Sequence, residues 1–344
     1  MKRKEFITVF DKQFATFLDE QCASVHSHFS DDTFQALTNY IKQFHQGGKR
    51  IRPYLVYLLH QGFGWTHEHI LQLSMSNELI HLFALIHDDI IDKWTIRHNI
   101  PTYHLHAAAL YKDDHIWSAQ AMLLWDLVYT RAWKNVLKYC DNISIMQLII
   151  SLAEEVVIGE MIDVHMSASQ HLYTAKEILF KDKIKSWYYT FTRPMMLGAK
   201  LANVEQTTLD HVEALGNNIA TAFQLRDDLM DCIDTHANKT TFSDLQEWNQ
   251  TILLHNTLVA ITESEREYIL NNRWKKLDAD TISIIQSLIK KSWALQETAQ
   301  LINHHLALAT EQLADLPLMH QTAKDALQDI ITYLKISEET LKLS

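Results

Sequence analysis

"THEHILQLSMSNELIHLFALIHDDIIDKW", residues 66–94, is the stretch of this sequence that decides its fold. Apolar residues recur along it at helical spacing, and Thr66 stands where a helix N-cap is favoured. The pattern stops before "RHNIPT", where Pro101 disfavours helix for the residue that precedes it. The stretch therefore predicts one long, mostly apolar helix.

Helical spacing continues outward from this helix through almost the whole chain. Only seven glycines and four prolines occur in 344 residues, which favours long helices over turn-rich β structure. No segment shows convincing strand alternation, and no low-complexity linker divides the chain. We therefore predict a single all-α domain over residues 1–344. Further helices are expected over residues 10–25, 34–46, 52–64, 106–112, 115–139, 143–166, 174–202 and 208–233, with several shorter ones in 250–344.

Charge and cysteine usage narrow the class of protein. A formal net charge of −11 argues against general nucleic-acid binding, and any anionic substrate would need a local basic cluster or metal ions. Cys22, Cys140 and Cys232 lack metal-type spacing, which is typical of reduced thiols in a cytosolic protein. Glu154 and Glu155 interrupt the most apolar run, so no membrane span is predicted. We expect a soluble, cytoplasmic protein.

Two aspartate clusters carry the chemistry. Asp88 and Asp92 are four residues apart, so they share one face of a helix. "LRDDLMD" at 225–231 repeats the arrangement with Asp227 and Asp231. Mg²⁺ takes one or two carboxylates together with water and phosphate oxygens, and two such helices facing each other across a cavity would clamp metal ions. Helix capping or a solvated acidic face is the alternative, but both clusters fall within apolar helices, where capping does not explain them.

"GGKRIRP" at 47–53 is a second signal. Lys49, Arg50 and Arg52 open a predicted helix, and a helix N-terminus with basic side chains favours phosphate through its free N–H groups and dipole. Basic surface residues before a helix are the alternative interpretation. Aspartates that can bind metal ions, together with basic residues that can bind phosphate, predict a diphosphate substrate.

These segments resemble one family. "GGKRIRP", "HDDIIDKWTIRHNIPTYH" and "FQLRDDLMD", with "GEMID" at 159–163 and "KSWYYTFTRP" at 185–194, are similar in order and content to motifs of the all-helical trans-prenyltransferases, the isoprenyl diphosphate synthases of the polyprenyl synthetase family. The resemblance runs from Gly47 to about Leu245 and continues more faintly to the C-terminus. It implies a helical bundle around a central active-site cavity, as in isoprenoid synthases. It also implies Mg²⁺-dependent condensation of isopentenyl diphosphate with an allylic diphosphate.

Residue roles follow from the resemblance. Asp88 and Asp92 would hold two Mg²⁺ ions and Asp227 a third, supported by Asp89, Asp228 and Asp231. The expected catalytic set is Asp88, Asp92, Lys185, Gln224 and Asp227.

Substrate contacts are implied in the same way. Lys49, Arg52 and His81 would bind isopentenyl diphosphate. Gln224 and Ser186 would lie along the developing allylic cation. The allylic diphosphate would be held by Arg97, His98, Lys185 and Lys239. No protein base is evident, so the released diphosphate is the expected proton acceptor.

Product length should depend on the helix before Asp88. Phe83 and Ala84 lie five and four residues upstream of it, with Ile80 further along. In the family, paired aromatics at the two nearer positions resemble farnesyl makers, whereas a lone aromatic at the farther one resembles a class of geranylgeranyl makers. Phe83 with Ala84 fits the second pattern, so we predict a C20 product, with C15 the next choice.

Several positions depart from the family pattern. His98 replaces the second arginine of a pair and lacks its bidentate fork, and Asn99 replaces a glycine. Gln120 lies where a Gly–Asp pair is usual, and Asn249 stands at the place of a lysine that contacts allylic diphosphate. Each change could weaken diphosphate binding.

Three alternatives to a chain-elongating synthase therefore stay open. The first is a weakly active or non-catalytic subunit that regulates a heteromeric synthase. A terpene cyclase disagrees with the basic site at Lys49 and Arg52, because a cyclase binds no second diphosphate, and a metal-free helical scaffold is the third. A homodimer is the expected assembly, with a heteromeric partner as the alternative.

Overall fold

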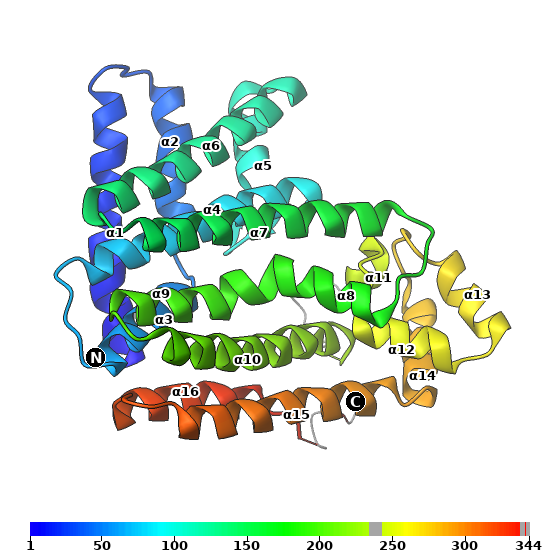
Figure 1. Cartoon of the computed structure of the whole chain (residues 1–344). Coiled ribbons are helices and arrows are strands. Elements are labelled where there is room, and N and C mark those ends of the chain that lie inside the picture. Colours follow the sequence, from blue (N-terminus) through cyan, green and yellow to red (C-terminus); the bar gives the residue numbers. More distant parts are fainter. Residues whose placement is uncertain (234–242, 338–340, 342–344) are drawn as a thin grey trace. The chain divides into compact units, whose positions relative to one another are not determined.

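The computed structural model describes residues 1–233, 243–337 and 341, so the candidate substrate residue Lys239 lies outside the described residues. Within them the chain is all-α apart from one hairpin of two two-residue strands, which confirms the predicted fold class (Figure 1). The chain separates into two compact units, unit 1 with Met1–His60 and Trp65–Ile149, and unit 2 with Gln61–Gly64 and Ile150–Ser344. The single domain over residues 1–344 stays a prediction.

Unit 1 holds the first helices and the hairpin. A buried stripe of Phe6, Phe10, Phe14 and Leu18 runs along α1 at every fourth residue, and the ring of Phe6 lies 5.4 Å from that of Tyr54 on α3. This spacing explains why the N-terminal segment folds as a helix with one face against its neighbours. The elements are α1 (Arg3–His26), α2 (Asp32–Phe44), α3 (Ile51–Gly62), whose last two residues belong to unit 2, α4 (Ile70–Ile91), β1 (Ile96–Arg97), β2 (Ile100–Pro101), α5 (Tyr103–Tyr111) and α6 (Asp114–Tyr139).

The long apolar helix α4 starts later than predicted. It begins at Ile70, and its N-cap position is His69, which makes no side-chain capping bond. Thr66 is therefore not the N-cap. The backbone N–H of His69 donates to Nδ1 of His67 at 3.1 Å, and this local bond stabilises a turn in place of the first helical turn.

A short antiparallel hairpin follows α4, where no strand was predicted. Arg97 pairs with Ile100 across it, and the two turn residues, His98 and Asn99, have φ of 50° and 65°. Two-residue hairpin turns need positive φ at both central positions, and asparagine tolerates that conformation. Asn99 is thus suited to the position where the family pattern has glycine.

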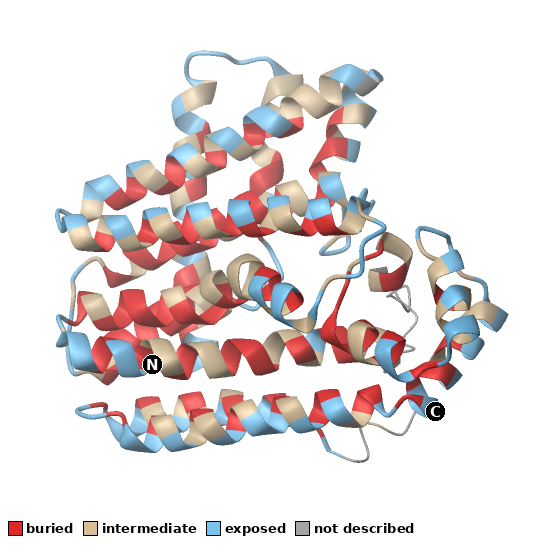
Figure 2. Cartoon of the chain, turned by 45° about the vertical axis from the view of Figure 1, so that its right-hand side comes forward, coloured by how far each residue is buried: buried red, intermediate tan, exposed pale blue. Residues whose placement is uncertain are grey.

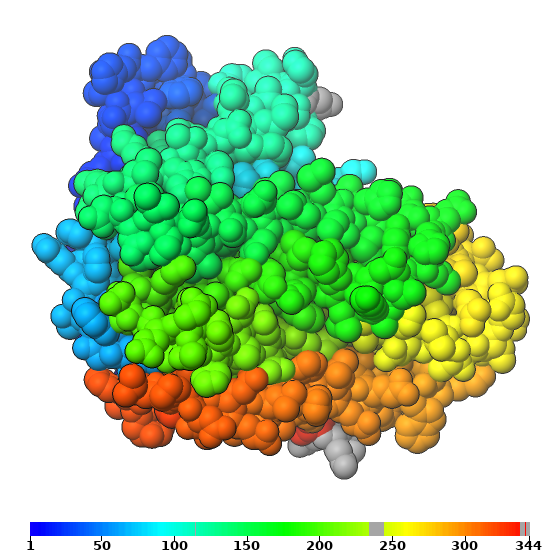
Figure 3. Space-filling view, viewed as in Figure 1, coloured from blue at the N-terminus to red at the C-terminus, as the bar shows by residue number. Residues whose placement is uncertain are grey.

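Unit 2 is built around α10. This helix contacts η1, α9, α12 and α15, and Figure 3 shows the orange and red α15–α16 segment packed directly against the yellow-green part of the chain. Most helices are buried along one side and exposed along the other (Figure 2). The elements are α7 (Ile143–Ala168), which begins in unit 1, α8 (Ala175–Asp182), η1 (Lys183–Thr192), α9 (Arg193–Leu201), α10 (Gln206–Ile233), α11 (Ser243–Glu247), α12 (Ile252–Ala260), α13 (Glu263–Asn271), α14 (Ala279–Lys291), α15 (Ala294–Asp315) and α16 (Gln321–Leu334).

The helix predicted over residues 174–202 contains a π-helical segment. Thr174 caps α8 through a capping box with Glu177, and the chain then continues through η1 into α9 without a break. Long π-helices are rare and are often found at functional sites. Here the π-helical turns carry Lys185 and Ser186, two of the candidate site residues.

Membrane insertion finds no support among the described helices. Over residues 1–233 and 243–337, none of them combines the length and apolar character needed to span a bilayer.

Candidate active site

The first aspartate cluster lies at the C-terminal end of α4. Asp88 is in the last turn, and Asp92 is the C-cap residue, whose backbone N–H donates to the Asp88 carbonyl oxygen at 2.9 Å. The interpretation that this cluster lies well inside its helix was therefore wrong. Negative charge is unfavourable at the negative end of a helix dipole, so helix stability does not explain these carboxylates, whereas a bound cation would be attracted to them.

Asp89 is the buried member of this cluster. Its carboxylate accepts a hydrogen bond from Nε of Arg97 at 2.5 Å. Burial raises the pKa of Asp89 to about 6, although Arg97 opposes the shift. Arg97, a candidate contact of the allylic diphosphate, thus also balances a buried aspartate, and about a quarter of its side chain is exposed.

The basic segment before α3 divides into two kinds of residue. Arg50 is buried, and it donates to Asp11 at 2.6 Å and to Glu78 at 2.7 Å. The expectation that Arg50 helps to bind phosphate was wrong, because its guanidinium is engaged within the fold. Lys49 is exposed and Arg52 is partly buried, so these two remain the candidates for a diphosphate.

His81 lies among the cations of unit 1. Burial, followed by the positive charges of Arg52, Arg97, Arg50 and His98, holds the pKa of His81 well below its usual range. We call these five residues the basic cluster. A neutral His81 can offer a hydrogen bond to a ligand without adding charge.

His98, the residue in place of an arginine, already has a backbone partner. Its Nδ1 lies 3.0 Å from the carbonyl oxygen of Phe44. As a carbonyl oxygen only accepts, Nδ1 carries the proton in this contact, and Nε2 is the nitrogen left for a ligand.

The second aspartate cluster lies in the last two turns of α10. Asp227 is exposed, Asp231 is partly buried and Asp228 is buried. Gln224 donates to Asp228 at 2.7 Å, and Asp231 accepts from the backbone N–H of Asp244 at 3.3 Å. This cluster, like the first, occupies the C-terminal end of its helix.

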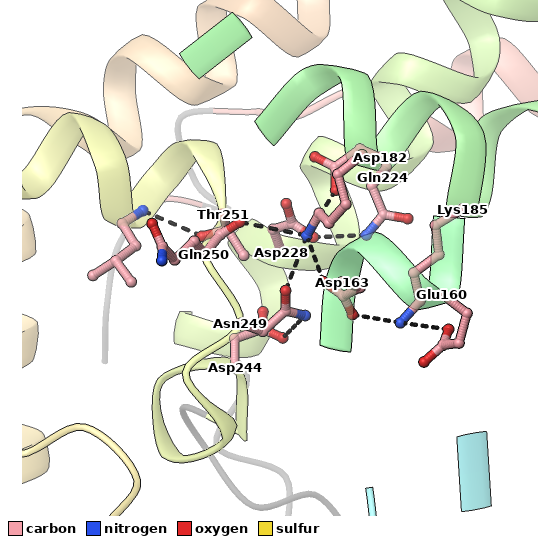
Figure 4. Close-up of polar contacts among 12 residues, drawn as sticks. Glu160, Asp163, Asp182, Lys185, Gln224, Asp228, Asp244, Asn249, Gln250 and Thr251 are labelled. Carbon is pink, nitrogen blue, oxygen red and sulfur yellow. Dashed lines mark hydrogen bonds and ion pairs between the residues drawn. The ribbon is translucent and has the colours of Figure 1, made fainter. Parts of the chain in front are cut away.

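A buried lysine that the sequence interpretation missed stands beside this second cluster. Nζ of Lys181 lies 3.1 Å from carboxylate oxygens of both Asp163 and Asp182. Figure 4 shows these two aspartates close to Asp228, Asn249 and Asp244. The lysine is only 3% exposed. We call Asp163, Asp182, Asp228 and Asp244, grouped around Lys181, the acidic cluster.

The carboxylates of the acidic cluster respond differently to burial. Burial would raise the pKa of Asp163, but Lys181 and Lys185 lower it to about 2. Burial, and then the charge of Asp182, raises the pKa of Asp228 well above its usual range. Burial and neighbouring Asp231 do the same for Asp244. The cluster thus holds more carboxylates than its lysines neutralise.

Asn249 takes part in this network. Its Oδ1 accepts from Nζ of Lys181 at 2.9 Å, and its Nδ2 donates to Asp244 at 3.1 Å. The sequence indicated that a cation is missing at position 249. Lys181 on α8 supplies one next to it.

Lys185 is positioned by a close approach of two helices. Its Nζ lies 2.6 Å from Asp163 and 3.0 Å from Glu160. A Cβ added to Gly159 on α7 would lie 2.4 Å from the Lys185 backbone, so only glycine permits this packing. The "GEMID" segment thus supports Lys185, and Ser186 follows it, partly buried.

The predicted chain-length residues are buried on α4. Ile80, Phe83 and Ala84 are all less than a tenth exposed. The ring of Phe83 lies 5.1 Å from that of Tyr129 on α6. The ring of Phe83 also lies 4.4 Å from that of His87. A smaller residue at position 83 would remove both ring contacts.

A metal ion is suited to the donors that are present. In the part of the chain that the structure describes, no three His, Cys, Asp or Glu side chains are already arranged around one metal position. Mg²⁺ needs only one or two carboxylates when substrate phosphates complete its shell. The two aspartate clusters offer oxygen ligands alone, which is the chemistry that Mg²⁺ prefers.

Solved structures share this fold. The geranylgeranyl pyrophosphate synthase from Corynebacterium glutamicum, complexed with isoprenyl diphosphate and magnesium, superposes with a TM-score of 0.86 over 97% of this chain and 99% of that chain, at 22% identity. The architecture defines an all-α protein with the fold of prenyl diphosphate synthases.

The chain belongs to the polyprenyl synthetase family, whose profile matches residues 32–291. The geranylgeranyl diphosphate synthase of Saccharolobus solfataricus is 26% identical over 83% of this chain and 85% of its own length. The heptaprenyl diphosphate synthase component 2 of Geobacillus stearothermophilus is 24% identical over 84% of this chain and 85% of its own length. The protein is therefore a prenyltransferase enzyme.

Proposed function

We propose that this enzyme condenses isopentenyl diphosphate with an allylic diphosphate in a Mg²⁺-dependent reaction whose main product is geranylgeranyl diphosphate. Farnesyl diphosphate is the next candidate product. The observation that carries the proposal is the membership of the family together with two aspartate clusters at helix ends. The three cysteines form no disulfide, which agrees with the expected cytoplasmic location.

Each aspartate cluster has a role in this proposal. Asp88 and Asp92 hold two magnesium ions, and Asp227 with Asp231 holds a third. Bound magnesium supplies neutralisation of the diphosphate charge as the C–O bond breaks. Asp89 is held in place by Arg97, so it orients the neighbouring carboxylates and does not bind metal itself.

The cations bind and orient the two substrates. Lys49, Arg52 and neutral His81 bind isopentenyl diphosphate, and Arg97, His98 and Lys185 hold the allylic diphosphate. Gln224, fixed by its bond to Asp228, and Ser186 direct their dipoles toward the allylic cation. Such preorganised dipoles stabilise charge as it develops. The departing diphosphate takes the proton that restores the double bond.

A direct assay tests the reaction. The purified protein is incubated with Mg²⁺, isopentenyl diphosphate and radiolabelled dimethylallyl, geranyl or farnesyl diphosphate, and the products are separated by chromatography. C20 product from any primer supports the proposal. The absence of elongation with all three primers rejects it.

Product length has its own test at Phe83. Replacement Phe83→Ala removes the ring that packs on Tyr129 and should give products longer than C20. Replacement Ala84→Phe adds bulk on the same helix and should shorten the product to C15. An unchanged product range in both variants would contradict a role of this helix in chain length.

A weakly active subunit of a heteromeric synthase is the second candidate function. It is favoured by the similarity to a relative named as one component of a heptaprenyl diphosphate synthase, and by the substitutions His98 and Asn249. In that case the chain alone elongates primers slowly, and addition of a second chain raises the rate.

Self-association is proposed from one face of α7. Ile143, Ile150, Val157 and Val164 recur every seven residues and are 37–71% exposed. β-Branched residues at this spacing favour pairing of two helices, and we propose a homodimer through this face. Replacement of Ile150 and Val157 by lysine should halve the mass measured by light scattering. An unchanged mass would contradict this interface.

A further inference from the structure

Unit 1 contains a cavity of about 720 Å³ that none of the proposed catalytic residues lines. The residues that line it belong to α1, α4 and α6, three helices that are labelled in Figure 1. The volume is in the range of small-molecule binding sites. Its walls include apolar side chains, Val9, Phe17 and Met75, together with an unusual concentration of polar groups.

Arg131 on α6 is the central polar group of this cavity. It lines the cavity and is 5% exposed. Nη2 donates to the carbonyl oxygen of Gln21 at 3.2 Å, but Nη1 has no hydrogen-bond partner. Among the described residues no carboxylate lies within 4.0 Å of the guanidinium. Burial raises the pKa of the adjacent Cys22 thiol, so that thiol is uncharged and is no counterion.

A buried cation without a counterion is costly to a fold. Charges are normally buried only when they are paired, because burial removes their hydration. Arg131 cannot lose its proton to escape this cost. The position therefore suits an anionic group that enters the cavity and reaches Nη1.

Three acceptor atoms in the same cavity also lack donors. They are Oε1 of Gln13, Oε1 of Gln72 and Oδ1 of Asn135. Asn135 is fixed by its Nδ2, which donates to the Gln72 carbonyl oxygen and, at 2.9 Å, to Ser76. Unmatched acceptors need donors on a ligand, and hydroxyl groups supply them.

Lysines give the mouth of the cavity a positive charge. Lys12, Lys134 and Lys138 are exposed and line it, with Glu20 the one carboxylate among its lining residues. With Arg131, four cations face one acid in a chain whose net charge is −11. This local reversal of sign attracts a multiply charged anion.

We propose that this cavity binds a small organic phosphate whose carbon skeleton carries hydroxyl groups. The phosphate contacts Nη1 of Arg131 and the lysines at the mouth, and the hydroxyls donate to the acceptors of Gln13, Gln72 and Asn135. The site is separate from the basic cluster and from both aspartate clusters, since it shares no residue with them.

Calorimetric titration of the whole chain tests the site. Glucose 6-phosphate, inorganic phosphate and geranyl monophosphate are compared as probes, in EDTA to withhold divalent metals from the aspartate clusters. We expect one molecule of glucose 6-phosphate per chain, bound about tenfold more tightly than either other probe because only it offers both phosphate and hydroxyls. Equal or tighter binding of inorganic phosphate or geranyl monophosphate would overturn the assignment of the ligand class.

Charge-reversal variants locate the binding. Lys134→Glu with Lys138→Glu should weaken it about tenfold or more, whereas the control pair Lys275→Glu with Lys276→Glu, two exposed lysines of unit 2, should change it less than about twofold. Arg131→Met should abolish binding. If that variant does not fold, the exposed lysine pair decides. Binding that survives the first pair but is lost in Arg52→Ala would place the ligand in the basic cluster and overturn the proposal.

Discussion

The basic cluster of unit 1 and the acidic cluster of unit 2 bury charge in opposite ways. In the basic cluster, buried Arg50 pairs with Glu78 and Asp11, and partly exposed Arg97 pairs with Asp89. In the acidic cluster a single buried lysine serves several carboxylates at once. Pairwise neutralisation leaves a nearly balanced site, whereas a shared cation leaves surplus negative charge. The first arrangement suits the recognition of an anion, and the second suits the gathering of cations.

The largest effect is expected when one aspartate of either cluster is replaced. Asp88→Asn and Asp227→Asn should each lower kcat/KM for elongation by about 10³-fold, because each removes a charge that stabilises the transition state. Asp329→Asn, an exposed acid on α16, is the control. Steady-state kinetics with saturating Mg²⁺ measures the losses. A large loss in only one of the two variants would show that the clusters do not serve the same reaction.

Removing the shared cation should be the next largest change. Lys181→Met leaves buried Asp182 without its partner and Asp163 with Lys185 alone, and it should lower the free energy of unfolding by about 3 kcal/mol. Lys183→Met, two residues away but partly exposed, should cost less than about 1 kcal/mol. Urea denaturation compares the two variants. Equal costs would mean that Lys181 is not what holds the acidic cluster together.

The two clusters should also respond to pH with opposite signs. The pKa of His81 is lowered in the folded state, so below about pH 6.5 the unfolded chain binds a proton that the folded chain does not, and acidification lowers stability. Burial raises the pKa of Asp182 although Lys181 opposes it. The folded chain therefore holds a proton longer, and a rise in pH above about 4 lowers stability.

Matched variants separate these contributions. His81→Gln should reduce the loss of stability that the protein shows as pH falls from about 6.5 to 5. Asp182→Asn should reduce the loss of stability as pH rises above about 4. Each change in the slope of the free energy of unfolding should be at most about 1.4 kcal/mol per pH unit. Calorimetric scans across this range measure both slopes. If the variants have the same slopes as the unchanged protein, the prediction that the two clusters respond to pH with opposite signs is wrong.

The smallest expected effect concerns position 249. Asn249→Lys restores the residue of the family pattern, but Lys181 already brings a cation to within 2.9 Å of that side chain. We expect KM for the allylic diphosphate to change less than about threefold. A tenfold decrease in KM would show that Lys181 does not substitute for the missing lysine.

The sequence predicted the helices well because apolar periodicity is a local signal. The helix that carries Asp88, the helices on either side of it and the two aspartate clusters follow directly from the spacing of apolar and acidic residues. The start of α4 was wrong because a side-chain bond of His67 competes with the helix. The hairpin at 96–101 was missed because its strands are only two residues long.

The site was harder to predict where partners come from distant segments. Nothing near Arg50 in the sequence indicates that Asp11 and Glu78 neutralise it. Lys181 meets Asn249 across 68 residues of chain, and its only sequence signal was its place four residues before Lys185. Pairings of this kind depend on the tertiary packing, which spacing alone does not contain.

The glycine at position 159 lets α7 and η1 pack so closely that they form one rigid unit. With backbone meeting backbone there, Lys185 cannot shift along α7 without taking Glu160 and Asp163 out of reach. The ammonium group is therefore presented at a fixed place, and adaptation to substrates of different size has to occur elsewhere in the enzyme.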